Sequence, residues 1–219
     1  MLVIGAAAAS VATACTPPSP AVPGNAADFS INVWSGWVQR WNPCAAVDYR
    51  VNVQQAPAAL AAVQSAVGQL SKATGITFAY RGTTTYIPRA NGWGSQPASL
   101  VIGFARHNGL LGGSNLLTSS YQLGEGGFQS SMFSWAGRIT SYKITKGYVV
   151  LDTDGFNRAS AHVKTAVLLH ELGHAVGLNH ARFSSEVMYS SVSNGGPDYY
   201  SAGDLAGLRK LGRGAGCLS

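Results

Sequence analysis

The stretch from His170 to His180, which reads HELGHAVGLNH, decides the fold and the chemistry of this chain. Because His170 and His174 are four residues apart, they lie on one face of a helix and can bind the same metal ion. If that helix continued, His180 would lie roughly 9 Å further along its axis and could not reach the ion. Glycine adopts positive φ without steric cost, so Gly177 is expected to end the helix and turn the chain back. The stretch therefore predicts three histidine ligands around one metal ion.

Glu171 is the carboxylate inside this stretch, and it directly follows the first histidine. Three neutral imidazoles leave the fourth position of a tetrahedral zinc ion open to water, which is typical of a catalytic site. Zinc lowers the pKa of that water to about 7, and a nearby glutamate can accept its proton as the water attacks a carbonyl carbon. We expect one catalytic Zn²⁺ with Glu171 as the general base.

The composition is typical of one secreted, loop-rich domain. The chain has 219 residues, of which 46% are hydrophobic and 11% are charged, and it contains 27 glycines. This balance excludes a largely disordered chain, and the length is enough for a substantial core. The net charge is +6, but the basic residues form no cluster of the kind that nucleic-acid binding needs. We expect a monomeric catalytic domain over residues 28–219 that does not bind nucleic acid.

The amino end predicts export. Residues 2–14, LVIGAAAASVATA, are apolar but too short to span a bilayer, so residues 1–14 are interpreted as a signal peptide. The small residues before Cys15 resemble a bacterial lipobox, which makes Cys15 a candidate for lipid attachment and membrane tethering. Residues 15–27 are rich in proline and are expected to form a tether. The expected location is secreted or on the extracytoplasmic surface, with or without a lipid anchor.

Two cysteines remain in the folded part, Cys44 near its start and Cys217 near its end. In an oxidising compartment they are expected to form a disulfide. Closing so long a loop stabilises by roughly 4–5 kcal/mol in the chain-entropy model. The alternative is a pair of unpaired, buried thiols.

The remaining patterns alternate between strand and helix. Strands are expected at 47–53, 76–80, 100–104 and 147–151, and helices at 57–73, 159–176 and 201–211. Residues 109–137 are rich in Gly and Ser and predict no particular element. This order predicts an α/β or α+β fold in which the metal-site helix lies behind a sheet.

Three tryptophans, Trp34, Trp37 and Trp41, recur at helical spacing. We expect them to form an apolar helix face that covers the core, with a surface stripe that binds a cell wall as the alternative.

The spacing HExxHxxGxxH from His170 to His180, followed by a methionine-containing turn, resembles the metzincin zinc peptidases. The turn reads SSEVMYSS, and Tyr189 directly follows Met188, as it does in matrixins. The sequence therefore looks like a bacterial matrixin-like metzincin. The resemblance covers residues 45–212. It implies a metzincin-like zincin fold, with a twisted mixed sheet above a cleft, an active-site helix, a Met-turn and a C-terminal helix. It also implies a zinc-dependent endopeptidase that acts on protein or peptide substrates.

The resemblance implies further roles. Met188 would be a hydrophobic floor under the histidines, and Tyr189 would either line the substrate side or pack in the core. Asp204, early in the last helix, would accept hydrogen bonds from the backbone around Met188; the alternative is an exposed acid favoured by the helix dipole. His107 and His162 are too few for the second zinc site of some matrixins, so each is expected to have a structural role.

Other readings stay open. A tethered surface binding module could keep zinc without turnover, although a purely structural site normally closes its fourth position. An amidase that cleaves cell-wall peptides would use the same residues. Calcium binding is undetermined. Residues 152–157 resemble the start of a calcium loop, but Gly155 is at its fourth place and Val163 at its twelfth, so a turn and a helix cap are expected there.

Overall fold

The computed structural model describes residues 21–135 and 137–218 of the chain. The expected signal peptide, Cys15 and the first part of the proline-rich segment lie outside these residues. In the described part, no helix is both long and apolar enough to cross a membrane.

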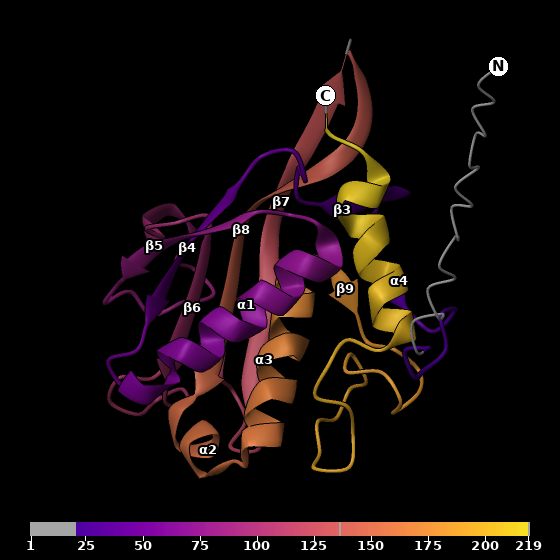
Figure 1. The fold of residues 1–219 in the computed structure, drawn as a ribbon. Helices are drawn as coiled ribbons and strands as arrows, with labels where there is room; N and C mark the ends of the chain where they lie inside the picture. The colour runs from indigo at the N-terminus through magenta and orange to yellow at the C-terminus, as the bar shows by residue number, and fades with distance from the viewer. Residues whose placement is uncertain (1–20, 136, 219) are drawn as a thin grey trace, which may run out of the picture.

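The domain is built on a seven-stranded sheet with helices against one face (Figure 1). The strands of this sheet are β2 (Val33–Trp34), β3 (Trp37–Arg40), β4 (Val47–Asn52), β5 (Phe78–Thr83), β6 (Leu100–Ala105), β7 (Gly124–Trp135) and β8 (Arg138–Asp152). The α-helices are α1 (Leu60–Thr74), α2 (Thr153–Arg158), α3 (Ala161–Ala175) and α4 (Ala202–Leu211). A separate small sheet pairs β1 (Ser30–Ile31) with β9 (Leu178–Asn179). Short 3-10 turns occur at η1 (Pro57–Ala59), η2 (Trp93–Ser95) and η3 (Arg213–Ala215).

The centre of the sheet is parallel, in the order β3-β8-β6-β4-β5. The strand β6 is buried along its whole length, as expected for an apolar run in a parallel sheet. Helices α1 and α3 lie across one face and α4 lies beside them (Figure 1). Their apolar faces and the inner face of the sheet form one continuous core. The mixed α/β architecture and the metal-site helix behind the sheet agree with the sequence analysis.

The hairpin of β7 and β8 was not foreseen in its full length. Sequence analysis assigned no element to residues 109–137 and only a short strand at 147–151, but β8 has 15 residues and β7 has 12. The reason is that β7 contains three glycines and several serines, which have low intrinsic preference for strands. Pairing with β8 overrides that preference. Among the described strands β7 pairs only with β8, so its other edge has no strand partner.

The expected tryptophan helix face is wrong. Trp34 and Trp37 pair across a hairpin, because Ser35 and Gly36 have φ of 51° and 80° and form a two-residue turn. The side chains of Trp34 and Trp37 are 61% and 39% exposed, whereas Trp41 is only 5% exposed. A period of three or four residues can arise by chance in so short a segment, and here it does not reflect a helix.

The described end of the predicted tether is held by the domain. Pro23 accepts a hydrogen bond from Ala202 N (2.9 Å), and Asn25 N donates to Glu186 Oε1 (2.8 Å). The folded part therefore begins a few residues before residue 28. The segment 152–157, which resembles the start of a calcium loop, is a turn with a helix cap as expected, because Asp152 caps α2 by accepting from Gly155 N (2.6 Å).

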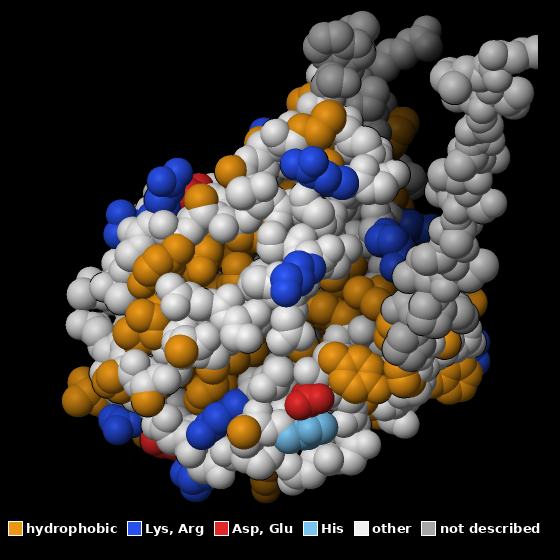
Figure 2. All heavy atoms as spheres, viewed as in Figure 1, with side chains coloured by type: hydrophobic (Ala, Val, Ile, Leu, Met, Phe, Trp, Pro, Cys, Tyr) orange, Lys and Arg blue, Asp and Glu red, His pale blue; other side chains and the backbone are white. Residues whose placement is uncertain are grey.

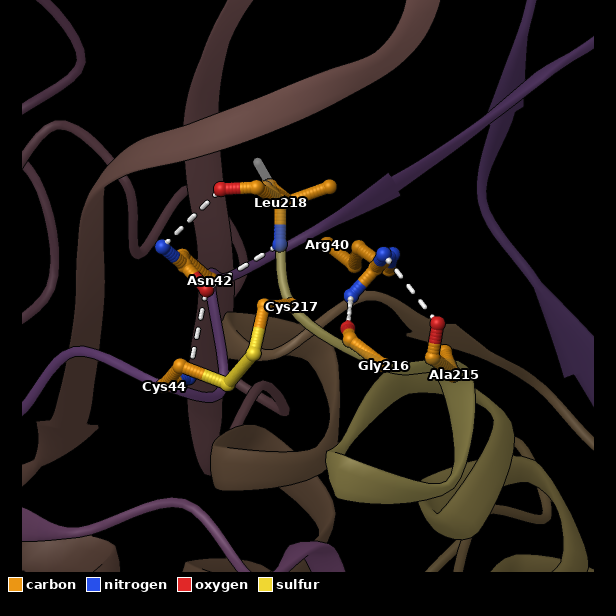
Figure 3. The surroundings of a disulfide bond; sticks show 7 residues. All are labelled: Arg40, Asn42, Cys44, Ala215, Gly216, Cys217 and Leu218. Carbon is orange, nitrogen blue, oxygen red and sulfur yellow. Dashed lines mark hydrogen bonds between the residues drawn. A yellow bond between two sulfur atoms is a disulfide. The ribbon is translucent and has the colours of Figure 1, made fainter.

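The predicted disulfide between Cys44 and Cys217 is present, with the two Cα atoms 5.4 Å apart (Figure 3). Asn42 secures the same junction, because its Oδ1 accepts from Cys44 N (3.1 Å) and from Leu218 N (3.2 Å). Arg40 donates to backbone oxygens of the same C-terminal tail. The carboxyl end is thus joined to the segment that follows β3.

Basic side chains do not gather on the face shown in Figure 2. Lys and Arg side chains are scattered there among polar and apolar surface. No helix or groove on this face carries the continuous basic stripe that is typical of nucleic-acid binding.

Candidate metal centre and active site

The structure brings His170, His174 and His180 together. The Nε2 atom of His174 lies 3.1 Å from Nε2 of His170 and 3.3 Å from Nε2 of His180. Ligand nitrogens at 2.0–2.1 Å from a tetrahedral zinc ion lie about 3.3–3.4 Å apart, so this spacing fits zinc. Among the described residues, these histidines are the one group of three or more metal-binding side chains that could share an ion.

The turn at Gly177 delivers the third histidine. Helix α3 ends at Ala175, and Gly177 has φ of 109°, a conformation that L side chains rarely adopt. A Cβ atom at Gly177 would also lie only 2.7 Å from the carbonyl oxygen of Gln39. The glycine is therefore required both for its conformation and for the close approach of β3.

Backbone carbonyls orient two of the imidazoles. His170 Nδ1 lies 2.8 Å from Val187 O, and His174 Nδ1 lies 2.9 Å from Leu178 O. A carbonyl can only accept, so each Nδ1 carries the proton and each Nε2 presents its lone pair to the shared centre. Burial, with a smaller contribution from His174, lowers the pKa of His170 to about 3. Burial likewise lowers the pKa of His174 to about 4 and lowers that of His180.

Glu171 is buried next to these ligands. Burial first, and then the charge of Glu125, raise the pKa of Glu171 to about 8, while a hydrogen bond from the Gly126 backbone opposes the shift. Strand β7 lies against α3 here: a Cβ atom on Gly126 would overlap the backbone oxygen of Glu171, and one on Gly124 would lie 2.8 Å from its Cγ. The two glycines therefore allow the unpaired edge of β7 to reach the carboxylate.

A single cleft of about 510 Å³ exposes the histidines and the glutamate to solvent. Its walls come from the loop before β7, the start of β7, α3, His180 and the end of the Met-turn together with Val192. The lining residues outside the ligand group are Tyr121, Gln122, Leu123, Gly124, Glu125, Gly126, Val167, Ser190, Ser191 and Val192.

Met188 lies beneath the helix that carries the first two histidines. It is buried, and its sulfur occupies the space next to Gly173, where any side chain would overlap it. The Met188 carbonyl accepts from Ala181 N (2.9 Å), the residue directly after the third histidine. Met188 is thus part of the core and also the floor of the site, as the resemblance implied.

Tyr189 does not line the cleft that holds the histidines. It lines a neighbouring cavity of about 270 Å³, which shares Ser191 and Val192 with that cleft. The side chain is partly exposed, so simple core packing does not describe it.

Asp204 joins the last helix to the Met-turn. Its carboxylate accepts from Val187 N (2.9 Å), Met188 N (3.2 Å) and Ser201 N (2.9 Å). Asp204 is 1% exposed, so the alternative of an exposed acid in the first helical turn is wrong. Burial raises its pKa to about 6, although the hydrogen bonds from Ser201 and Val187 oppose the shift.

Two further acids, Glu186 and Asp28, were missed in the sequence. Glu186 is buried; its Oε2 accepts from Gly203 N (2.9 Å) and Asp204 N (3.1 Å), and its Oε1 accepts from Asn25 N. Asp28 binds the segment after the third histidine in the same way. Glu186 lies in the Met-turn segment SSEVMYSS and Asp28 lies in no motif, and no signal in a single sequence distinguishes either from a surface acid.

The two spare histidines lie apart from the cleft and from each other. His107 Nε2 is 3.3 Å from Asp152 Oδ1, and His162 Nε2 is 2.8 Å from Gly196 O. Each therefore links two segments of the chain that are distant in sequence, in keeping with the structural role expected for both.

Comparison with known proteins places this site within a known family. A sequence comparison with curated proteins found no match. The family model described as matrixin matches residues 40–211, which is more than half of the chain and includes α3, the Met-turn and α4. The bacterial origin that the resemblance suggests stays a prediction. With this match and a three-histidine site that fits zinc, the chain belongs to the matrixin family of metallopeptidases.

Proposed function

We propose that this chain is a zinc-dependent endopeptidase in which Glu171 is the general base. The observation that carries the proposal is the joint presence, in one cleft, of a three-histidine site, a buried carboxylate and a free strand edge.

His170, His174 and His180 would hold the ion through their Nε2 atoms. A bound Zn²⁺ would supply a water of lowered pKa and would polarise the scissile carbonyl. Its charge would also favour the ionised form of Glu171, against the effect of burial.

Glu171 lies where it can accept a proton and later donate it. Its carboxylate is buried beside the ligands, so it can take a proton from the attacking water and pass it to the leaving amine. Low local polarity strengthens its interaction with the developing charges. A module that kept zinc for structure alone would gain nothing from burying a carboxylate there, which favours turnover over binding.

The start of β7 supports a peptide as the substrate. An extended peptide can add to an unpaired strand edge through backbone hydrogen bonds. The edge of β7 that faces away from β8 borders the cleft at Gly124–Gly126, next to Glu171. A peptide paired there would have its backbone close to the three histidines.

The proposed site of action is outside the cytoplasm. The disulfide between Cys44 and Cys217 supports an oxidising compartment. Lipid attachment at Cys15 stays a prediction.

The experiment is digestion of a mixed peptide library by the purified, zinc-loaded chain, with cleavage sites identified by mass spectrometry. Parallel samples contain a chelator, and others contain isolated peptidoglycan instead of the library. Cleavage within linear peptides that the chelator abolishes is the expected result. Cleavage of cell-wall peptides alone would make the chain an amidase, and binding of zinc without hydrolysis of either substrate would make it a binding module.

A further inference from the structure

The third histidine is held differently from the other two. His170 and His174 lie within α3, where backbone hydrogen bonds of the helix hold their main chain. His180 lies after the short strand β9 and is exposed on a loop. A ligand on a loop stays in place only if the segments on both sides of it are tied to the rest of the fold.

Residues 30–32 tie the segment before His180. Strand β1 pairs with β9, placing Ser30 opposite Asn179 and Ile31 opposite Leu178. Next to this pair, Asn32 N donates to Gly177 O (2.8 Å).

Asp28 ties the segment after His180. Its Oδ1 accepts from Arg182 N (2.9 Å), and its Oδ2 accepts from Phe183 N (2.9 Å). Asp28 is itself buried, and its own N–H donates to Asn25 O (2.8 Å). Both oxygens of one fixed carboxylate thus hold consecutive backbone amides. Hydrogen bonds to an ionised acceptor are about twice as strong as neutral ones.

We propose that Asp28 is a positioning residue for the third metal ligand and sets the zinc affinity of the site through His180. The inference rests on the proposed zinc site, although not on the peptidase activity. One short segment, residues 28–32, holds the chain on both sides of His180, and Asp28 is the member that supplies a charge. Partners that orient a metal ligand change metal affinity by about 10–100-fold when they are removed.

The discriminating variant is Asp28→Asn, because an amide keeps one acceptor oxygen and turns an NH₂ group towards the other backbone N–H. Zinc affinity is measured in the full chain by competition with a chromophoric chelator. We expect it to fall about 10–100-fold. The matched control is Asp154→Asn, an acid whose side chain is 49% exposed and pairs with Arg106 on the surface; its zinc affinity should not change.

The same measurement in a His180→Ala background separates positioning from general support. If Asp28 acts through His180, then Asp28→Asn should cause no further loss of affinity once the imidazole is gone. The absorption spectrum of the Co²⁺ form gives a second readout, because displacing His180 changes the coordination of the metal. Should Asp28→Asn prevent folding, Asp28→Glu keeps both acceptors and displaces the loop, and is measured in the same cycle.

An unchanged affinity and Co²⁺ spectrum in Asp28→Asn would overturn the proposal. So would an equal loss of affinity with and without His180. Failure of the proposed function gives a different pattern, namely normal zinc affinity in the wild-type chain without peptide hydrolysis.

Discussion

The metal site is made of two regions that are held in place by different means. Helix α3 carries His170, Glu171 and His174, and its geometry follows from local rules: Ser160 caps the helix by accepting from Val163 N, and residues four apart share a face. The loop from Gly177 to Tyr189 carries His180 and Met188 and contains only the two-residue strand β9. The loop is fixed by contacts with parts of the chain that are distant in sequence.

Three buried acids make several of those distant contacts. Asp28 holds the segment after His180, Asp204 holds the backbone at Met188, and Glu186 reaches from the loop to both α4 and the amino end. Asp28 and Asp204 each accept two backbone N–H groups of the loop, and Glu186 accepts N–H groups at the start of α4 and at Asn25. The difference teaches that a helix satisfies its own backbone, whereas this loop depends on buried carboxylates that join it to distant segments, with Asp28 and Asp204 outside the loop and Glu186 within it.

The largest effect should come from the helix region. Replacing Glu171 by Gln keeps the shape of the side chain and removes the base, so kcat/KM for peptide hydrolysis should fall by about 10²–10⁴-fold. Zinc content, measured by elemental analysis, should stay the same because Glu171 is not a ligand. Turnover close to wild type at full zinc content would show that the proton goes elsewhere.

The disulfide provides a contrast, because it lies outside both regions of the site. Replacing Cys44 and Cys217 together by Ala should lower the free energy of unfolding by roughly 2–5 kcal/mol, since the bridge closes a loop with a sequence separation of 173. Denaturant unfolding measures this loss. Peptide hydrolysis by the fraction that remains folded should be unchanged, and a large fall in kcat would mean that the C-terminal tail supports the cleft.

In the absence of zinc, protonation of the histidines of the helix region should lower the free energy of unfolding as the pH falls. The folded state keeps His170 and His174 neutral, with pKa values of about 3 and 4, whereas the unfolded chain takes up protons near pH 6.5. Their contribution to stability is therefore present above pH 6.5 and is lost as the pH falls towards 3, by a few kcal/mol. Unfolding of the chelator-treated chain at several pH values tests this. Because Glu171 and Asp204 titrate with the opposite sign over this range, the histidine contribution is taken as the difference from a variant in which both histidines are replaced by Ala. A difference that stays constant between pH 6.5 and 4 would contradict the prediction.

In the loop region, the change of stability with pH should have the opposite sign. The loss of unfolding free energy on mutation should also be smaller than the effects above. Asp204→Ala leaves three backbone N–H groups without their acceptor and should cost about 1.5–3 kcal/mol with zinc saturating. Because the pKa of Asp204 is raised to about 6, its titration contributes stability that is fully present below pH 4 and is lost as the pH rises through 6.

The control for this variant is Asp154→Ala, a partly exposed acid in α2 whose loss should cost under about 0.5 kcal/mol. Equal losses for the two variants in denaturant unfolding would remove the distinction between the buried acid and the surface acid.

Much of the site could be predicted because it depends on neighbours in the chain. The spacing of His170 and His174, the positive φ at Gly177 and the helix that begins after Ser201 follow from helix geometry and glycine sterics, which act over a few residues. The disulfide followed from the cysteine count together with the expected compartment. The role of Asp204 came only through the family resemblance, since a lone acid early in a helix has several ordinary explanations.

The sequence by itself determined the ligand set, the adjacent carboxylate and the helix that carries them, because spacing and backbone preference are local properties. Only the tertiary structure decided which glycine-rich segment becomes the strand β7 beside Glu171, which tryptophans are exposed, and which acids hold the loop of His180. Strand pairing and buried hydrogen bonds join residues far apart in the chain, and their free energy depends on a partner and on the exclusion of water. Neither the partner nor the burial can be seen in a stretch such as Asp28–Asn32 before the chain has folded around it.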